Sequence, residues 1–250
     1  MSLTDSATAL CWTDRGLAPA AEGEPVGQLL VADSWLVVDG AARAEDAHWL
    51  RFGDSCRELG VETAEFRRAV TDALPAAGRW FPRVELTAAS SLRLWIRPAP
   101  APAAGGLVVA VAAPGDPRSC PRRKGPDLDM LIGLRGRAGV DELLLCDIDG
   151  ALLEGTLSSL LWWEDGVLWT TPAEHTLPGV TRALIVELAR GRGVDVGVRA
   201  PSAAELAGRE VWLTSALHGI RSVDRWLSPA QVAGPAEQAP QWQAALEAMR

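Results

Sequence analysis

The chain has 250 residues, of which 48% are apolar and 22% are charged, values that are ordinary for a globular protein with a sizeable core. Its formal net charge of −8 argues against a nucleic-acid-binding surface, because nucleic-acid phosphates attract basic faces. No apolar run approaches the length of a membrane span, and the N-terminus lacks a basic-then-apolar signal pattern. We therefore expect a cytoplasmic protein without a membrane partner.

Metal and disulfide chemistry find no support in the sequence. The four cysteines lie far apart and include no CxxC pair, and the three histidines are equally scattered. This spacing suits neither a disulfide framework nor a zinc site. We expect no metal.

The first half of the chain predicts a mixture of strands and helices. Residues 27–40 form an extended apolar stretch that ends in an Asp-Gly turn signal. A helix is expected over 44–60, and its apolar stripe consists of Trp49, Phe52, Cys56 and Leu59. The remaining elements of this half are a second helix over 61–78 and strands within 84–100 and 105–114.

The second half predicts a strand meander followed by a helix. The meander has strands at 141–147, 151–156, 158–163 and 167–171, with Asp-Gly hairpin turns at 149–150 and 165–166. A helix over 177–193 starts after Pro-Gly and stops at glycines. The final elements are a strand in 194–201, a short helix in 202–208, an extended segment over 210–223 and a terminal helix in 235–250.

The two halves are joined by a segment typical of a linker. Residues 113–127 contain four prolines and two glycines. We therefore predict an α/β (mixed α+β) protein of two subdomains: a smaller N-terminal α/β domain over 1–114, a linker over 115–123 and a larger C-terminal domain over 124–250. Because small-molecule sites tend to form between domains, the site is expected at this junction.

Lys124, at the far end of this linker, is the only lysine of the chain, whereas the other 23 of the 24 basic residues are arginine. Arginine can replace lysine where only a positive charge is needed, but not where a deprotonatable primary amine must form an imine. Chance survival of one lysine in an exposed loop explains the composition equally well. The rest of the chain has to decide between these readings.

Three further features each have a functional and an ordinary reading. Glu154 interrupts an apolar strand, where a buried carboxylate needs a partner such as a protonated heterocycle nitrogen or an arginine. The helix that begins near Thr181 directs backbone N–H groups and a positive dipole outward, which suits phosphate, although most helices begin this way without binding anything. Arg51 is either a second contact to that anion or a solvated side chain.

Together, these four features are the groups needed to hold pyridoxal 5'-phosphate. The amine binds the aldehyde, the carboxylate keeps the ring nitrogen protonated, and the helix terminus and the arginine take the phosphate.

The ordered segments DELLLCDIDGALLEGTLSSLLWWEDGVLWTTP, HTLPGVTRALIVELA and EVWLTSALHGIRSV resemble the class IV pyridoxal-phosphate aminotransferase family, which has fold type IV. That family contains branched-chain and D-amino-acid aminotransferases and 4-amino-4-deoxychorismate lyase. The resemblance runs from about Val31 to Val223. It implies pyridoxal 5'-phosphate as the cofactor, a small-molecule amine as the substrate and a homodimer.

The resemblance also implies roles for particular residues. Lys124 takes the position of the imine-forming lysine, in the KGPDLD form of lyase-like members, and Glu154 takes the position that pairs with the pyridine nitrogen. Ser34 falls where deoxychorismate lyases carry a catalytic hydroxyl. The other implied cofactor contacts are Arg51, Val180 and Thr181 at the phosphate, Leu177 beneath the ring, and Ser215.

Some positions depart from the family pattern. Ser159 stands where many members have asparagine, and Ala216 stands where the aminotransferases have a phosphate-binding threonine, although Thr214 and Ser215 lie beside it. The stretch from Lys124 to Asp141 is a few residues short.

The chain also has no tyrosine, which the aminotransferases use around the substrate carboxylate. This absence favours the lyase reaction, which yields 4-aminobenzoate and pyruvate, over a branched-chain or D-amino-acid aminotransferase. A non-catalytic member of the family is a third alternative. Candidates for binding a substrate carboxylate are Arg93, Arg97 and Arg221.

Overall fold

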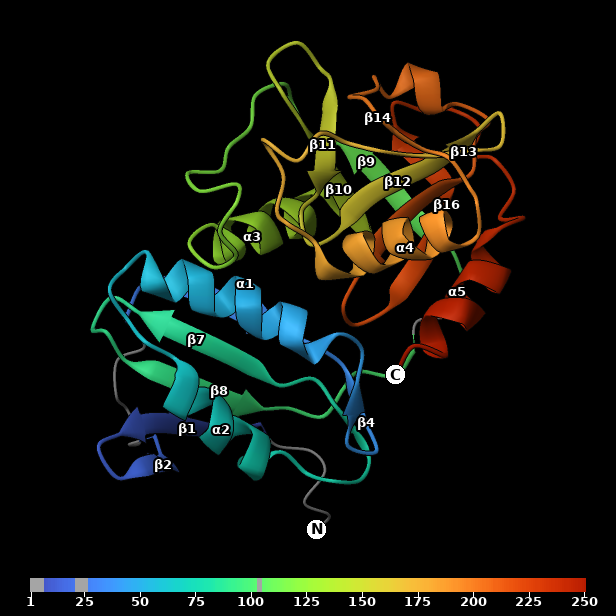
Figure 1. Cartoon of the computed structure of the whole chain (residues 1–250). Coiled ribbons are helices and arrows are strands. Elements are labelled where there is room, and N and C mark those ends of the chain that lie inside the picture. The colour runs from blue at the N-terminus through green and yellow to red at the C-terminus, as the bar shows by residue number, and fades with distance from the viewer. Residues whose placement is uncertain (1–6, 21–26, 103–104) are drawn as a thin grey trace. The chain divides into compact units, whose positions relative to one another are not determined.

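The structure is a computed structural model that describes residues 7–20, 27–102 and 105–250 (Figure 1). The chain forms two compact units. The first contains Met1–Ala101, Arg123–Pro126 and Arg250, and the second contains Pro102–Arg122 and Asp127–Met249.

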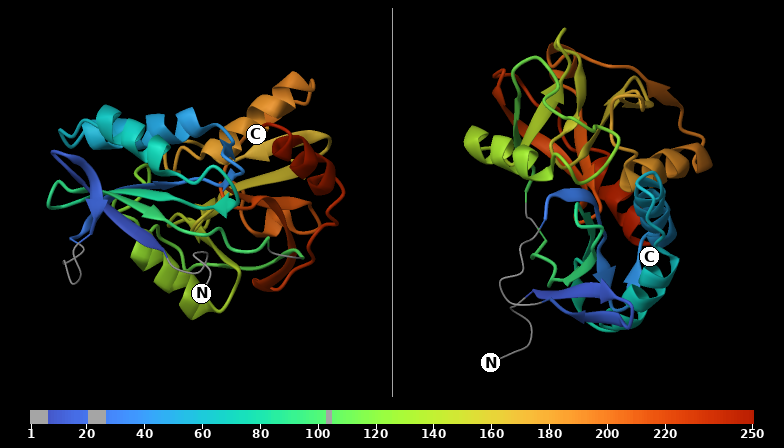
Figure 2. Two further views of the ribbon diagram at one scale, coloured as in Figure 1. Left: turned by 90° about the horizontal axis from the view of Figure 1, so that it is seen from below. Right: turned by 90° about the vertical axis from the view of Figure 1, so that its left-hand side faces the viewer.

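The first unit is built on a five-stranded antiparallel sheet with the strand order β2-β1-β8-β7-β3. Its strands are β1 (Thr8–Thr13), β2 (Gly16–Pro19), β3 (Leu29–Ser34), β7 (Arg83–Thr87) and β8 (Leu92–Ile96). A small sheet adds β4 (Val37–Val38), β5 (Ala41–Ala42) and β6 (Arg79–Trp80). The unit also contains two helices, α1 (Glu45–Arg57) and α2 (Ala64–Ala73), which pack against the five-stranded sheet (Figures 1 and 2).

The core of this unit forms where the apolar faces of the helices meet the sheet. Trp49, Phe52 and Cys56 of α1 are buried, as their spacing predicts, together with Phe66 and Val70 of α2. The fourth residue predicted for the stripe of α1, Leu59, is 40% exposed. That prediction was wrong, because the helix ends at Arg57 and Leu59 no longer follows its periodicity.

Two features of this unit differ from the sequence prediction. The segment 84–100, expected to hold one strand, contains most of β7 and all of β8, which pair as an antiparallel hairpin across residues 88–91. The β1–β2 hairpin was not predicted, because its side chains are mostly half-buried and show no alternation.

The second unit contains an eight-stranded mixed sheet with the order β11-β10-β9-β16-β15-β12-β13-β14. Its strands are β9 (Leu107–Val111), β10 (Glu142–Cys146), β11 (Leu152–Gly155), β12 (Ser159–Glu164), β13 (Val167–Thr170), β14 (Val196–Val198), β15 (Val211–Ser215) and β16 (Gly219–Ser228). Its helices are α3 (Leu128–Ala138), α4 (Val180–Gly191), α5 (Ala239–Glu247) and a short 3-10 helix (Ala204–Leu206). Figure 2 shows them from two further sides.

The four strands predicted within 141–171 are confirmed, and they form two antiparallel hairpins, β10–β11 and β12–β13. The prediction of one meander was wrong, because β9, β16 and β15 lie between the two hairpins in the sheet. The Asp165-Gly166 turn that joins β12 to β13 has positive φ at both residues, 50° and 77°, as this type of hairpin turn requires. Between β12 and β15, Trp162 and Trp212 are fully buried and belong to two apolar clusters on the sheet. The mixed α/β architecture predicted from the sequence is therefore confirmed.

The predicted boundaries 1–114, 115–123 and 124–250 do not coincide with the two units. β9 was assigned to the N-terminal domain, but it pairs in parallel with β10 and β16 and so belongs to the second unit. Lys124 was assigned to the C-terminal domain, but Arg123–Pro126 group with the first unit. The sequence could not show this, because strand pairing and loop docking are long-range contacts.

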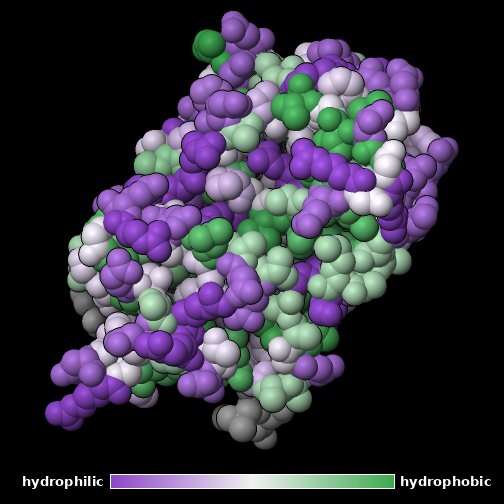
Figure 3. All heavy atoms as spheres, in the orientation of Figure 1, coloured by the Kyte–Doolittle hydropathy of each residue, from purple (hydrophilic) through white to green (hydrophobic). Residues whose placement is uncertain are grey.

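Within the described residues, no helix is long and apolar enough to cross a membrane. On the face shown in Figure 3, hydrophilic and hydrophobic residues are interspersed.

Candidate active site

Lys124 is held against strand β3 by its own backbone. The carbonyl oxygen of Lys124 accepts a hydrogen bond from the N–H of Ala32 at 2.7 Å. Gly125 has a φ of +141°, and a Cβ at this position would lie 2.8 Å from the Cα of Val31. A larger residue would therefore push the loop away from the strand, so Gly125 keeps Lys124 in place.

The buried carboxylate of Asp33 lies at the centre of a charged cluster in this unit. Its Oδ1 accepts hydrogen bonds from Nδ1 of His48 at 3.0 Å and from Nη2 of Arg51 at 2.7 Å. Its Oδ2 accepts a second bond from Nε of Arg51 at 2.8 Å. The Nζ of Lys124 lies 4.0 Å from Oδ1. Asp33 thus joins Arg51 and Lys124, both of which the sequence had singled out.

The Lys124 amine is unusually easy to deprotonate. Burial lowers the pKa of Lys124 to about 8, and the nearby positive charges of Arg51, Arg83 and Arg97 act in the same direction. The negative charge of Asp33 opposes them and raises the pKa of Lys124. The side chain is 26% exposed. Both the ammonium and the neutral amine are therefore populated near neutral pH.

Asp33 itself stays ionised. Burial would raise the pKa of Asp33, but Arg51, the hydrogen bond from His48 and the charge of Lys124 hold this pKa well below its usual range. Burial lowers the pKa of His48, so the imidazole is neutral at physiological pH and donates from Nδ1.

Ser34 follows Asp33 at the end of β3 and is buried. Its N–H donates to Oδ1 of Asp33 at 2.7 Å, and its Oγ lies 3.5 Å from Nη2 of Arg97. The Nε of Arg97 donates to the carbonyl of Phe81 at 3.1 Å, and its guanidinium lies 5.3 Å from the centre of the Phe81 ring. Arg97, one of the three arginines proposed for a substrate carboxylate, thus lies beside Ser34.

In the second unit, Glu154 lies on β11 and is 4% exposed. Its Oε1 accepts hydrogen bonds from the N–H of Leu177 at 2.8 Å and from Nη1 of Arg118. Arg118 is fixed in turn by two bonds of 2.8 Å to Asp116 and by one of 2.8 Å to the carbonyl of His175. Within the described residues, Oε2 of Glu154 accepts no hydrogen bond. This oxygen is left for another donor.

The Glu154 carboxylate titrates near neutrality. Burial raises the pKa of Glu154 to about 7, against the lowering effect of Arg118, the Leu177 N–H and Arg182. Arg182 is itself buried and donates to Oγ1 of Thr176 at 3.1 Å.

The N-terminus of α4 has no side-chain cap. Its N-cap residue is Gly179, and Val180 and Thr181, the first two helical residues, are buried. A Cβ on Gly179 would lie 2.4 Å from Oγ of Ser159, so a larger residue would force this hydroxyl or the start of the helix to move. The first N–H groups of a helix have no partner within it, and they favour an anion.

Ser215, the last predicted cofactor contact, ends β15. Its Oγ accepts a bond from the N–H of His218 at 3.3 Å, while Oγ1 of Thr214 donates to the carbonyl of Ser159 at 3.4 Å. Both hydroxyls therefore take part in local hydrogen bonds at the strand end.

Sequence reasoning missed Asp33, His48 and Arg118. Asp33 could have been found by the criterion that identified Glu154, since it is a charged residue inside an apolar strand. No local pattern marks Arg118, because its partner Glu154 lies 36 residues further along the chain.

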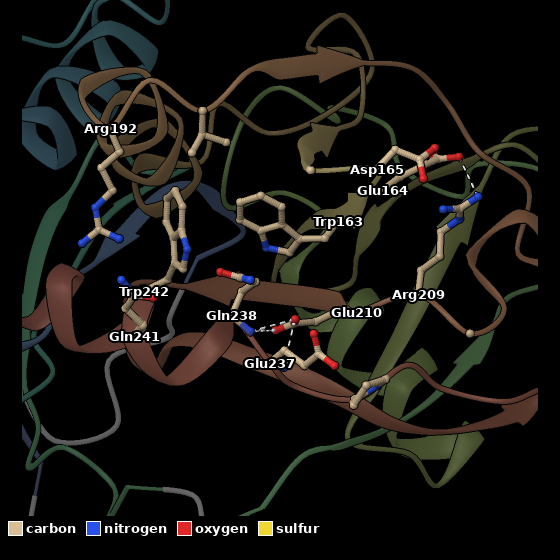
Figure 4. Close-up of a pocket in the computed structure, with 14 residues that line it drawn as sticks. Trp163, Glu164, Asp165, Arg192, Arg209, Glu210, Glu237, Gln238, Gln241 and Trp242 are labelled. Carbon is tan, nitrogen blue, oxygen red and sulfur yellow. Dashed lines mark hydrogen bonds and ion pairs between the residues drawn. The ribbon is translucent and has the colours of Figure 1, made fainter.

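A pocket with a volume of about 620 Å³ lies elsewhere on the second unit, with Trp163, Trp242 and Arg192 among the residues that line it (Figure 4). Its Glu210 accepts hydrogen bonds from backbone N–H groups at the start of α5, from Glu237 to Ala239. None of the predicted site residues lines this pocket.

Comparison with known proteins finds both a family match and similar folds. The family model of amino-transferase class IV matches residues 134–226. The branched-chain-amino-acid aminotransferase of Salmonella typhimurium is 34% identical over 101 residues, which are 38% of this chain and 33% of the relative. The match thus spans about a third of that relative's length.

Two solved structures resemble the whole chain. A hypothetical aminotransferase from Mycobacterium tuberculosis has a TM-score of 0.79 at 22% identity and covers 96% of this chain and 98% of its own. It is also known in a PLP-bound form. A protein of Legionella pneumophila, provisionally named 4-amino-4-deoxychorismate lyase, has a TM-score of 0.75 at 16% identity and covers 92% of this chain and 97% of its own.

These likenesses define the protein as one with the fold of the fold type IV enzymes. The likeness to the amino-transferase class IV family in sequence is confined to residues 134–226.

Proposed function

We propose that the protein is a pyridoxal 5'-phosphate enzyme that acts on the amino group of a small carboxylate-bearing substrate, with Lys124 as the residue that binds the cofactor. One observation carries the proposal. The single lysine of the chain is held on β3 beside the buried Asp33, and its pKa is lowered to about 8. A surface lysine left by chance would have neither property.

The residues present fit this cofactor. Glu154 is anchored through Oε1 and leaves Oε2 without a donor among the described residues, which suits a protonated ring nitrogen. The uncapped N-terminus of α4, with Val180 and Thr181, suits the phosphate. On the resemblance to the family, Arg51 is a further candidate for a positively charged contact to the phosphate. When bound, pyridoxal 5'-phosphate supplies an electron sink for negative charge that develops beside the substrate nitrogen.

The protein's own groups supply proton transfer and orientation. Lys124 can take up or release a proton near neutral pH, because both of its forms are populated there. Arg118 and the Leu177 N–H keep the Glu154 carboxyl in one orientation.

For the particular reaction, we propose conversion of 4-amino-4-deoxychorismate to 4-aminobenzoate and pyruvate. Lys124 would take a ring proton, the C–O bond to the enolpyruvyl group would break, and the ring would become aromatic. The buried hydroxyl of Ser34 could deliver a proton to the departing group, and Arg97, 3.5 Å from it, could bind a substrate carboxylate. The absence of tyrosine from the chain also supports the lyase.

The second candidate is an aminotransferase of the branched-chain type, which the similarity to branched-chain-amino-acid aminotransferases favours. This reaction would use Lys124 to move a proton between two carbons and would need a keto-acid acceptor. On the resemblance to the family, we also expect a homodimer, which light scattering would test.

An absorption spectrum with added pyridoxal 5'-phosphate tests the cofactor proposal. We expect a band at about 410–430 nm that borohydride removes and that Lys124→Ala lacks. A wild-type protein that shows only unbound cofactor would overturn the proposal. Product assays then separate the two reactions: the lyase forms 4-aminobenzoate and pyruvate without a keto acid, whereas the aminotransferase requires one.

A further inference from the structure

The first unit places an excess of positive charge around Lys124. Arg51 comes from α1, Arg83 from β7, and Arg97 directly follows β8. All three lower the pKa of Lys124. Two carboxylates face this group, Asp33 and Glu85.

These two carboxylates are used differently. Glu85 lies 2.6 Å from Nη2 of Arg83 and accepts a hydrogen bond from Nε1 of Trp95 at 2.9 Å. Asp33 is the carboxylate within 4.0 Å of the Lys124 ammonium. The remaining titratable neighbour, His48, is neutral and donates to Asp33. Asp33 is therefore the one negative charge of the described residues that forms an ion pair with Lys124.

We propose that Asp33 is a positioning residue whose carboxylate holds Arg51 with two hydrogen bonds and stabilises the protonated form of Lys124, and that it thereby sets the pH at which the neutral amine appears. Its geometry suits this role. Asp33 is fully buried, so its charge is poorly screened by water and acts strongly on a neighbour. Because Arg51 fixes both of its oxygens, the carboxylate cannot turn away from Lys124.

The consequence for the reaction rests on the proposed function. A lysine that must both remove and return a proton needs both of its forms within reach at the working pH. Without Asp33, the surrounding arginines would favour the neutral amine, and Lys124 would act as a base but seldom as an acid.

The test uses the protein without added cofactor and exploits the single lysine. Trinitrobenzenesulfonate reacts with neutral amines, so its rate at Lys124, followed by peptide mass spectrometry from pH 5.5 to 10, reports the protonation of that amine. The N-terminal amine of the same molecules is the internal control.

We expect half-maximal labelling of the wild type near pH 8. In Asp33→Asn, the profile should move to lower pH, and a shift of one pKa unit would raise the labelling rate at pH 6 about tenfold. Arg97→Gln is the control. Because the charge of Arg97 lowers the pKa of Lys124, its removal should move the profile in the opposite direction, to higher pH. A folded Asp33→Asn protein with an unchanged profile, or one moved to higher pH, would overturn the proposal.

Asp33→Asn leaves Arg51 without its carboxylate, and this variant alone could fail to fold. The double variant Asp33→Asn/Arg51→Met avoids this problem, because both partners of the buried pair are then replaced. It is compared with Arg51→Met, in which Asp33 keeps the hydrogen bonds from His48 and from the N–H of Ser34 and the nearby charge of Lys124. The profile of the double variant should lie at lower pH than that of Arg51→Met. Equal profiles would refute the role of Asp33.

The labelling experiment and the cofactor spectrum can fail separately. A labelling shift without a cofactor band would leave the role of Asp33 intact and remove the proposed function. A cofactor band without a labelling shift would support the proposed function and overturn the role of Asp33.

Discussion

Replacing Glu154 by glutamine should stabilise the protein without its cofactor, and the gain should grow with pH. Glu154 is 4% exposed, and burial raises its pKa from 4.5 to about 7 despite the Arg118 contact. The folded state thus disfavours the ionised carboxylate. Glutamine has nearly the same shape and carries no charge to desolvate.

The size of the effect follows from the two pKa values. Because the folded pKa is raised, the stability contributed by Glu154 is fully present below pH 4.5 and is lost as the pH rises through about 7. One pKa unit corresponds to about 1.4 kcal/mol. Relative to the wild type, Glu154→Gln should therefore gain about 2–3 kcal/mol between pH 5 and pH 8.

Urea unfolding at pH 5, 6, 7 and 8 measures this gain. Glu164→Gln is the control. Burial raises the pKa of Glu164, but the contacts with Arg199 and Arg209 together outweigh burial and lower this pKa, so the stability difference of the control from the wild type should stay constant above pH 5. A difference for Glu154→Gln that is equally flat would refute the reasoning. It would mean that Arg118 keeps Glu154 ionised throughout.

Three further substitutions test the local geometry. Gly125→Ala, whose Cβ would lie 2.8 Å from the Cα of Val31 at a φ of +141°, should lower the unfolding free energy by about 1–3 kcal/mol; unchanged urea unfolding would show that the loop can move off β3. Gly179→Ala should also lower the unfolding free energy by about 1–3 kcal/mol. Adding Ser159→Ala should restore part of this loss, because the new Cβ clashes with Oγ of Ser159. Additive effects in the double-mutant cycle would contradict the contact. Leu144→Ala, at a fully buried position of β10, should cost about 2–5 kcal/mol, and calorimetry showing less than 1 kcal/mol (roughly a conservative exchange) would mean that the sheet closes around the cavity.

Much of the fold could be predicted because its signals are local. The Asp165-Gly166 turn needs positive φ, and its residue types indicate this directly. The stripe of α1 was recognisable up to Cys56, and the error at Leu59 came from extending the period beyond the last helical residue. Helix ends depend on a few terminal contacts, and periodicity carries no information about those.

The sequence indicated some residues of the candidate site, but it did not indicate which residues contact them. Lys124 stood out by composition, and Glu154 by its position in an apolar strand. Their partners Asp33 and Arg118 were not anticipated, since each is recognised only by what lies beside it.

The sequence by itself determined the mixed α/β class, the positions of most helices and strands and several residues able to carry amine and carboxylate chemistry. Periodicity, turn chemistry and side-chain type are properties of short segments, and so they can be read without the fold. Only the tertiary structure decided that β9 joins the second unit and that Lys124 docks on β3 in the first. It also decided that Asp33 lies beside Lys124 and that Arg118 donates a hydrogen bond to Glu154. These outcomes depend on charges and hydrogen bonds between residues far apart in the chain, whose strength is set by burial.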